Sequence, residues 1–472
     1  MVNIIIDEKN ISAEEGSTVL AAAKENGIYI PTLCAYEGIK PLASCRLCIV
    51  EVEGEEKEKP ACALKVKEGM VIHTASSKLY EKRREILIEM FRRHSVDCHH
   101  CLRIGSTKAK DFDPKFCESC FFCDCVRDGF CELQQKALEF GIDELPFEPH
   151  TNDFEADEST GCVIRNPNKC IKCRRCIEIC ASQGVGILKM LNTENGKIAG
   201  AEGSLNAAGC IRCGKCVNAC PTGALYMKEH KDEVVYYAHQ YGTKTAAMVC
   251  SCVLPPLEKL FKAPEGSFTY EKLIDGLYKL GIDYVFTPAA AKNISRSRAS
   301  VMLDERLGSK CLIMAEDYAA KRYLENNYPH LEEHFLFYDS IHKISSDYMH
   351  NKYHGIKFYN IHTRNSFGAE ALESGSADYF INPRELYRIF IRNGVDPARR
   401  NDADIDEMCE FEKCTKYEAL FNARCRASDE GIQELTFEEK GRIYKAAICR
   451  SPSQAAKAIE NMAEYDVIRV TA

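Results

Sequence analysis

Two runs of four cysteines with identical spacing constrain this chain more than any other feature. The order C-x2-C-x2-C-x3-C occurs at Cys170, Cys173, Cys176 and Cys180, and again at Cys210, Cys213, Cys216 and Cys220. Three thiolates at intervals of three wrap one corner of an iron–sulfur cubane, and the fourth reaches across to the partner cluster. The spacing therefore predicts two crossed ligand sets. One is Cys170, Cys173, Cys176 and Cys220; the other is Cys180, Cys210, Cys213 and Cys216.

Zinc binding and disulfide formation are the alternatives for such cysteines, but neither accounts for two complete runs in the same order. Pro221 follows the second run as the pattern requires, whereas Ala181 follows the first, which is a small departure. We expect residues 151–232 to form a bacterial-type ferredoxin domain with two [4Fe-4S] clusters. A chain with such a domain is expected to move electrons.

The composition agrees with a multidomain protein that uses its thiols as metal ligands. A chain of 472 residues is too long for one hydrophobic core. It has 27 cysteines, no secretory signal pattern at its start, and no apolar run of about 18 residues. These features predict a cytoplasmic protein without a membrane span. The formal net charge of −8 argues against nucleic acid as a partner.

Residues 1–78 predict a second kind of cluster. Strands are expected at 2–7 and 10–13, then a helix with Ser17 as its N-cap and Gly27 at its end. A close pair of thiols with one further thiol on either side comes next: Cys34, Cys45, Cys48 and Cys62. This arrangement resembles the β-grasp [2Fe-2S] domain of the large peripheral subunit of respiratory complex I and of [FeFe]-hydrogenases. The resemblance implies that the four thiols hold a [2Fe-2S] cluster; the alternative is four scattered core cysteines.

Residues 79–150 resemble the His/Cys [4Fe-4S] module of the same families. A charged amphipathic helix is expected from Tyr80 to Arg93, with Arg83 on its outer face. The resemblance implies that one cluster takes His94, Cys98, Cys101 and Cys131. The last gap of the module is much longer here than in the family, and four cysteines lie in the insertion. We assign these to a second site, for zinc or another cluster: Cys117, Cys120, Cys123 and Cys125.

Two other partitions of these ligands stay open. Cys98 and Cys101 can combine with Cys117 and Cys120 across a gap that suits zinc, and Cys125-x5-Cys131 then matches the last gap of the module. In the remaining partition several of the thiols are free. The spacing does not decide among the three.

Alternating strands and helices predict an α/β domain at 233–400. Strands are expected at 245–249, 281–287 and 377–381, one helix at 271–280, and another that starts at Asn382 and Pro383. The segments LGIDYVF, YNIHTRNSFGAEA and ADYFINPREL resemble, in this order, the catalytic domain of [FeFe]-hydrogenases. Residues 401–472 are expected to be helical. Thr436 and Glu439 would form a capping box for a helix at 437–447, and Ser453 would start the last helix.

The motifs that hold the active-site cluster of that family are altered here. Glu316 and Asp317 stand where T-S-C-C-P has its cysteines, His362 replaces the cysteine of P-C-T-A-K, and the C-terminal C-x3-C segment has no counterpart. A soft iron–sulfur cluster needs thiolates. The domain is therefore interpreted as a degenerate hydrogenase body without the H-cluster and without catalytic residues. Glu316, Asp317 and His362 are expected to be polar replacements rather than ligands of a hard metal.

The other cysteines have no assigned role. Five are expected to be small buried residues: Cys162, Cys250, Cys252, Cys311 and Cys449. Cys409, Cys414 and Cys425 are spaced in a way that suggests a further cluster, but the gaps match no established pattern. Whether these three or Cys449 bind a cluster is left open.

The resemblance implies an electron-relay subunit of an electron-bifurcating NAD(P) transhydrogenase-type complex of anaerobes. Its cofactors would be one [2Fe-2S] and three [4Fe-4S] clusters, with an additional zinc ion or cluster. Because no Walker or G-x-G-x-x-G loop occurs, no flavin or nicotinamide is expected on this chain. The implied partners are a flavoprotein that binds NAD(H), a subunit that binds NADP(H), and soluble ferredoxin. The alternatives are a wiring subunit of a hydrogenase or formate dehydrogenase complex, a redox sensor, and an enzyme with a divergent site around His362.

Overall fold

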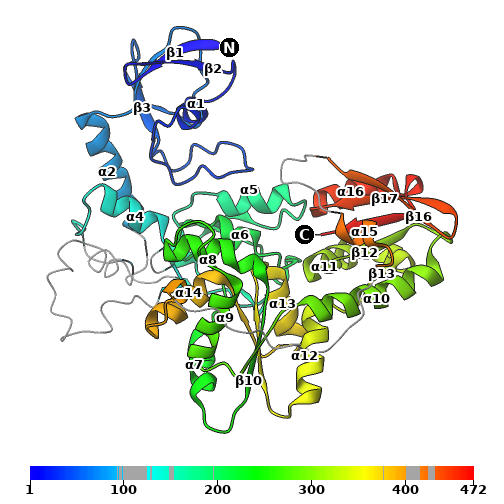
Figure 1. Ribbon diagram of the computed structural model, residues 1–472. Coiled ribbons are helices and arrows are strands. Elements are labelled where there is room, and N and C mark those ends of the chain that lie inside the picture. Colours follow the sequence, from blue (N-terminus) through cyan, green and yellow to red (C-terminus); the bar gives the residue numbers. More distant parts are fainter. Residues whose placement is uncertain are drawn as a thin grey trace.

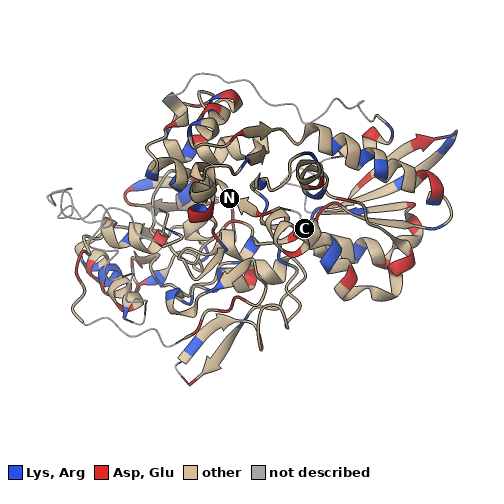
Figure 2. Ribbon diagram, turned by 90° about the horizontal axis from the view of Figure 1, so that it is seen from below, with Lys and Arg blue, Asp and Glu red and all other residues tan. Residues whose placement is uncertain are grey.

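In the computed structural model, the chain forms a small N-terminal domain, a central helical part and a two-lobed C-terminal body (Figure 1). The structure describes residues 1–92, 94, 98, 125–127, 130–147, 154–194, 196–375, 377–399, 415–423 and 431–471. Acidic and basic residues are interspersed along the ribbon of these parts (Figure 2). Among the described residues, no helix combines the length and the apolar character needed to cross a membrane.

The N-terminal sheet has the strand order β2-β1-β5-β3-β4. Its elements are β1 (Val2–Ile6), β2 (Lys9–Ala13), α1 (Val19–Glu25), β3 (Ile49–Val52), β4 (Lys59–Pro60) and β5 (Val71–His73). β1 pairs antiparallel with β2 and parallel with β5, as in a β-grasp fold. The two expected N-terminal strands are confirmed. The N-cap of α1 is Thr18, which accepts from the Ala21 N–H, and not Ser17.

Helix α2 (Ser77–Phe91) packs against strand β3 of the N-terminal sheet, and α4 (Glu132–Glu139) packs against α2 on the side of the central part (Figure 1). Ser76 caps α2, so the helix starts before the expected Tyr80. Arg83 is only 5% exposed, and its guanidinium donates to the carbonyl oxygen of Ile49 at 2.6 Å. The expectation that Arg83 faces solvent is wrong, because this side chain ties α2 to strand β3.

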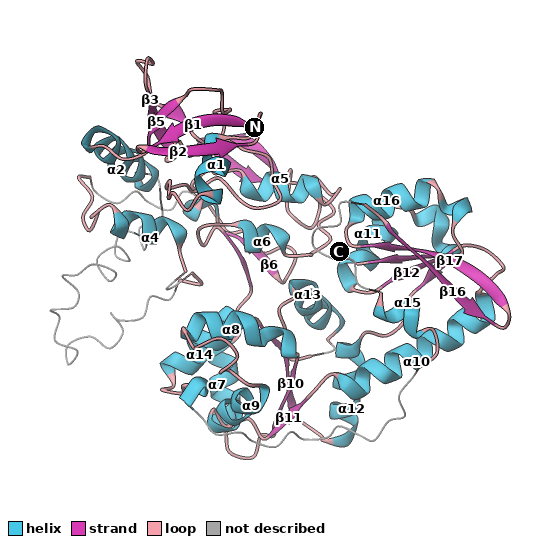
Figure 3. Ribbon diagram, turned by 45° about the horizontal axis from the view of Figure 1, so that its top comes forward, coloured by secondary structure: helices cyan, strands magenta, loops and turns pink. Residues whose placement is uncertain are grey.

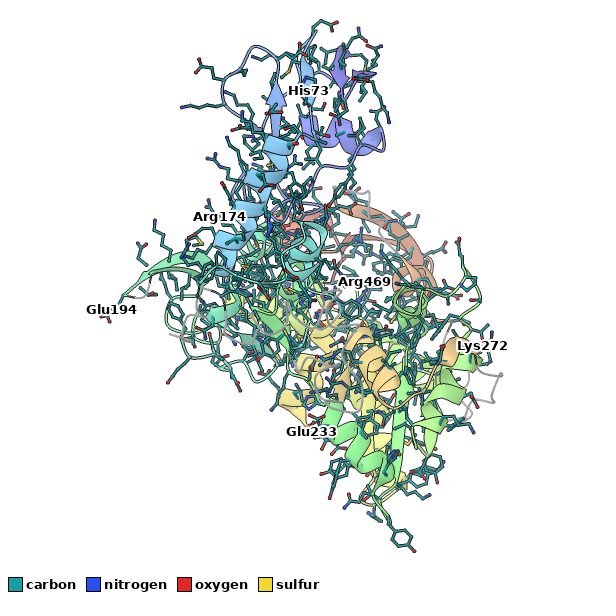
Figure 4. All side chains as sticks on the ribbon, turned by 90° about the vertical axis from the view of Figure 1, so that its left-hand side faces the viewer. His73, Arg174, Glu194, Glu233, Lys272 and Arg469 are labelled. Carbon is teal, nitrogen blue, oxygen red and sulfur yellow. The ribbon has the colours of Figure 1, made fainter. Side chains whose placement is uncertain are left out.

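The central part repeats a short helix after each cysteine loop. The helices are α5 (Arg175–Ser182) and α6 (Lys215–Ala219), flanked by the antiparallel pair β6 (Val163–Arg165) and β9 (Leu225–Met227). Arg174 and Gly214, which precede the two helices, both have a φ of 68°, so the backbone repeats as well as the sequence. Between the two cysteine runs the chain forms an antiparallel hairpin of β7 (Lys189–Thr193) and β8 (Gly196–Gly200). Glu194 marks its projecting tip in Figure 4.

The first sheet of the C-terminal body is parallel throughout, with the order β11-β10-β14-β15. Its strands are β10 (Thr245–Val249), β11 (Tyr284–Phe286), β14 (Lys357–Ile361) and β15 (Tyr379–Ile381). One face packs on α7 (Lys231–His239), α8 (Leu254–Phe261), α9 (Tyr270–Lys279) and α14 (Pro383–Arg392). The other packs on α12 (Ile341–Lys352) and α13 (Asn365–Ser374). The expected strands in this sheet, the helix near 271–280 and the Asn382 cap of α14 are confirmed.

The second sheet of the body has the order β13-β12-β18-β17-β16. Its strands are β12 (Leu312–Ala315), β13 (Phe335–Leu336), β16 (Gln433–Glu439), β17 (Arg442–Cys449) and β18 (Val467–Val470). The accompanying helices are α10 (Ala289–Arg306), α11 (Tyr318–Asn327), α15 (Glu418–Asn422) and α16 (Pro452–Glu460). β18 pairs in parallel with both β12 and β17, so the last strand of the chain lies in the middle of this sheet (Figure 3).

The expected helix at 437–447 is wrong, and the described part of 401–472 is mixed rather than helical, because strands β16, β17 and β18 accompany helices α15 and α16. Residues 433–449 form an antiparallel hairpin, and its turn residues Lys440 and Gly441 have φ angles of 51° and 76°. Two successive positive φ angles suit a tight hairpin turn and interrupt a helix. Phe437 lies opposite Tyr444 in the register, with ring centroids 5.6 Å apart. The apparent capping box is therefore part of a strand.

Candidate metal centres

Four thiols come together in the N-terminal domain, and all are buried: Cys34, Cys45, Cys48 and Cys62. The Cys34 side chain hydrogen-bonds with those of Cys45 and Cys62, and Cys48 hydrogen-bonds with Cys62. The hydrogen bond with Cys45 is the main cause that lowers the pKa of Cys34. The close pair lies on a tight loop in which Arg46 has a φ of 57°. Four convergent thiols in an apolar core fit the donor set of a [2Fe-2S] cluster.

The next four thiols line one cavity in the central part: Cys170, Cys173, Cys176 and Cys220. Burial is the main cause that raises the pKa values of Cys170, Cys173 and Cys176, and the charge of Cys220 adds to this effect. An apolar pocket favours the neutral thiols until a cation supplies the opposite charge. Iron binding must therefore displace protons here, and the donor set fits a [4Fe-4S] cluster.

Cys180 lies with the second cysteine run rather than with its own. Burial raises the pKa of Cys210 to about 12, and the charges of Cys213 and Cys180 contribute. The charge of Cys180 also raises the pKa values of Cys213 and Cys216. Since α5 carries Cys176 and Cys180 on successive turns, this one helix contributes a thiol to each group. The fold thus brings together the crossed sets that the spacing predicts, and metal ligation by them stays a prediction.

The His/Cys group is described only in part. His94 is buried, with its ring edge-on to that of Phe91 at a centroid distance of 5.8 Å. Cys98 is half-buried. Burial raises the pKa of Cys131 to about 11, and the charge of nearby Cys125 contributes. Cys125 therefore lies near Cys131, as the Cys125-x5-Cys131 partition requires.

Four thiols of this region lie outside the described residues: Cys101, Cys117, Cys120 and Cys123. The three partitions of the ligands therefore stay open.

The fully described thiol groups lie in a row. The Ser44 hydroxyl, next to Cys45, donates to the carbonyl oxygen of Cys173 at 3.0 Å. Cys45 and Cys173 also belong to the same apolar cluster. Further along, the charge of Cys176 raises the pKa of Cys216, so the two central groups are neighbours. Figure 3 shows the same order, from the N-terminal sheet through α5 and α6 to the body.

The second cysteine run packs directly on the C-terminal body. Cys213 lies in the same apolar cluster as residues of α11 and α16, and the charge of Asp317 raises its pKa after the larger effect of burial. The Asn365 amide donates to the carbonyl oxygen of Gly214 at 3.3 Å. Arg212 forms an ion pair with Glu373 of α13. The row of thiol groups therefore ends at the body.

Glu316 and Asp317, which stand in place of two family cysteines, both serve the packing of the body. A Glu316 carboxylate oxygen accepts from Arg469 and from Thr471, each at 2.7 Å. Asp317 caps α11 by accepting from the Ala320 N–H at 3.0 Å. It also pairs with the Arg364 guanidinium at 3.6 Å. These carboxylates do not fit the thiolate set that an iron–sulfur active site needs.

His362 lies instead with two cysteines that the sequence interpretation treated as small buried residues. Ligand atoms of Cys250, Cys252 and His362 all lie within 4.8 Å of one another. The missed signal is C-x-C directly after β10, since the carboxyl ends of neighbouring parallel strands meet at one edge of a sheet. The hydrogen bond between the two thiols lowers the pKa of Cys252 and raises that of Cys250.

The remaining described cysteines differ in how deeply they are buried. Cys162 and Cys449 are fully buried, and burial raises the pKa of Cys162. Cys311 is half-buried at the start of β12, and burial raises its pKa to about 12. Cys409, Cys414 and Cys425 lie outside the described residues.

Family profiles match three parts of the chain. Residues 1–77 match a 2Fe-2S iron-sulfur cluster binding domain, and 169–224 match a 4Fe-4S dicluster domain. Residues 243–470 match the C-terminal domain of the iron only hydrogenase large subunit. The chain combines 2Fe-2S, 4Fe-4S and [FeFe]-hydrogenase-like domains. The fold classes expected from the cysteine patterns and from the segments of the C-terminal half are thereby confirmed.

Three curated relatives are similar to this iron–sulfur chain. NADP-reducing hydrogenase subunit HndD of Solidesulfovibrio fructosivorans is 35% identical over 319 residues, which are 65% of this chain and 50% of the relative. A subunit of the NADH-quinone oxidoreductase of Rhizobium meliloti (strain 1021) is 36% identical over 230 residues, 48% of this chain and 24% of the relative. NADPH-Fe(3+) oxidoreductase subunit alpha of Geobacter sulfurreducens is 30% identical over 251 residues, which are 53% of this chain and 26% of the relative. The chain spans half or less of the length of these relatives.

Proposed function

We propose that this chain is the iron–sulfur electron-transfer subunit of an electron-bifurcating NAD(P) transhydrogenase-type complex. It relays single electrons between subunits that bind flavin and nicotinamide and soluble ferredoxin, and it does not activate hydrogen. The observation that carries the proposal is the unbroken row of buried thiol groups. The row runs from Cys34 past Cys173 and Cys176 to Cys216, and each group lies beside the next.

Two buried arginines lie beside the thiol groups and can stabilise negative charge there. When bound, the clusters supply sites that take up and release one electron. Arg175 is only 3% exposed, and its guanidinium forms a bidentate ion pair with the Glu132 carboxylate at 2.8 Å. The negative charges of Cys173 and Cys34 also interact with Arg175 and help to raise its pKa. A fixed cation between two neighbouring sites stabilises added negative charge at either one. Arg165 lies in the same way beside Cys170 and Cys176.

The relatives support the class of complex. Their names describe subunits of an NADP-reducing hydrogenase, an NADPH-Fe(3+) oxidoreductase and an NADH-quinone oxidoreductase. Each name couples a nicotinamide to a second redox partner. We assign the nicotinamide and flavin sites to partner subunits, because the sequence has no Walker or G-x-G-x-x-G loop.

The proposal that this chain does not activate hydrogen rests on three residues of the C-terminal body. Two of the positions that carry cysteines in the hydrogenase family hold Glu316 and Asp317, whose carboxylates are occupied by Arg469, Thr471 and the start of α11. His362 holds a third such position. A soft cluster has no matching set of thiolates at these places.

The test is anaerobic purification followed by iron and sulfide analysis and EPR. About 14 iron atoms per chain are expected for one [2Fe-2S] and three [4Fe-4S] clusters. Cys213→Ser should lose one [4Fe-4S] signal and keep the [2Fe-2S] signal, whereas the matched control Cys311→Ser should keep both. Hydrogen should not reduce viologen in the presence of the protein. Appreciable hydrogen oxidation, or unchanged EPR in Cys213→Ser, would contradict the proposal.

A further inference from the structure

The backbone of the parallel sheet places Cys250, Cys252 and His362 at one edge. β10 and β14 are neighbours in register, with Val249 opposite Ile361, and the Cys250 N–H donates to the carbonyl oxygen of Ile361 at 3.0 Å. Cys250 and His362 therefore leave the two strands side by side. A short 3-10 turn at Ser251–Val253 then directs Cys252 back toward them. The juxtaposition is a product of the fold, since His362 lies far from the two cysteines in sequence.

The surroundings of the three side chains orient them as ligands. The Cys252 N–H donates to Cys250 Sγ at 3.3 Å, and the Thr363 hydroxyl donates to Cys252 Sγ at 3.4 Å. Such hydrogen bonds favour sulfur in its thiolate form. The His362 ring is 7% exposed and packs edge-on against Phe367 at a centroid distance of 4.8 Å. Both sulfurs and the imidazole are thus held in place without a ligand.

The donor set matches the preferences of one class of metal. Two soft sulfurs and one imidazole are typical zinc ligands, and three protein ligands with an open fourth position are typical of zinc sites that bind water or substrate. Binding releases the two thiol protons, and the two thiolates then neutralise the charge of the Zn²⁺ ion. A [4Fe-4S] cluster is usually held by four protein ligands, one more than this group supplies.

We propose that Cys250, Cys252 and His362 form a zinc site at the carboxyl edge of the β10–β14 pair. The site is separate from the predicted cluster ligands and does not depend on the proposed electron relay. It takes the place where the hydrogenase family holds an active-site cysteine, now His362. Zinc there locks β10, β14 and the turn after β10 to one another.

One local rearrangement accompanies metal binding. His362 Nδ1 accepts the Arg364 N–H at 2.9 Å, which leaves Nε2 for the metal. Coordination through Nε2 requires that nitrogen to be free of its proton, so the proton moves to Nδ1 and this contact is lost. The change is confined to the segment after β14.

The test counts zinc in the whole chain with its clusters intact. Protein purified anaerobically is incubated with Zn²⁺, freed of excess metal by gel filtration, and analysed by mass spectrometry for zinc and iron. Cys252→Ser and His362→Gln should each hold one zinc equivalent less than the wild type. The control Cys311→Ser changes a cysteine outside the site and should hold the wild-type amount. Unchanged iron content and EPR spectra show that each variant has folded.

A second measurement uses the wild-type chain alone. Bound zinc should slow alkylation of Cys250 and Cys252 by iodoacetamide, read from the peptides that contain them, and leave that of Cys311 unchanged. Equal zinc in the wild type and both site variants would overturn the proposal. So would a disulfide between Cys250 and Cys252 in the anaerobic protein, or alkylation at the same rate with and without zinc.

Discussion

The Ser44 hydroxyl donates a hydrogen bond to the carbonyl oxygen of Cys173, at 3.0 Å. It is the point where the cysteine loop of the N-terminal domain meets the first run of the central part. The two residues lie far apart in sequence. Ser44 precedes Cys45 of the N-terminal thiol group, and Cys173 is a member of the first central group. The junction between the domains is therefore also the junction between two predicted cluster sites.

Replacing Ser44 with alanine should weaken this junction. A buried or half-buried neutral hydrogen bond contributes about 1 kcal/mol to folding, so the unfolding free energy in urea should fall by roughly that amount. Ser182→Ala is a suitable control, since its exposed hydroxyl donates to the Ile179 carbonyl of its own helix and accepts from the adjacent Gln183 amide, so both partners are local. Equal stability of Ser44→Ala and the wild type would show that the contact does not hold the domains together.

Gly214 should be intolerant of a side chain. Its φ is +68°, and an added Cβ would lie under 3.0 Å from the Cβ of Asn365 on the C-terminal body. Gly209→Ala is the matched control, because Gly209 also has a positive φ, +84°, but has open space around it. Both variants are destabilised by the left-handed backbone, and Gly214→Ala should lose about 1–3 kcal/mol more through overpacking. Urea unfolding measures the difference; similar losses in both variants would argue against tight contact between the second cysteine run and the body.

Glu370 should make the protein less stable as the pH rises. Burial raises the pKa of this carboxyl to about 7, above its ordinary value of 4.5. Between these two values the unfolded chain has released a proton that the folded chain keeps, so stability falls with rising pH and the loss is complete above about pH 7. Glu370→Gln should remove this loss and be more stable than the wild type at pH 8, by on the order of 1–3 kcal/mol, but not at pH 4. Thermal unfolding at the two pH values tests this, and a difference that does not change with pH would contradict it.

His94 is predicted to be a cluster ligand, and its replacement with cysteine should lower the reduction potential of that cluster. A thiolate donates more negative charge than a neutral imidazole and so makes the cluster harder to reduce. EPR-monitored redox titration measures the shift, with the signals of the other clusters as internal references. An unchanged potential, at unchanged iron content, would remove His94 from the ligand set.

Local patterns accounted for much of the fold. The alternating apolar residues of β1 and β2, the apolar run of β10, and the Asn382-Pro383 start of α14 were all predictable, because each depends on residues close in sequence. The hairpin β16–β17 was not. Its register is set by the turn at Lys440 and Gly441 and by pairing with β18, which a helical interpretation of 437–447 could not include.

The sequence by itself determined the grouping of the thiols at 34–62 and at 170–220, since their spacing is that of cysteine loops and short helices whose geometry is local. Only the tertiary structure decided which groups are neighbours, through Ser44 and Cys173 and through Cys176 and Cys216. It alone brought His362 to Cys250 and Cys252, because the register of two parallel strands joins residues that no local pattern connects.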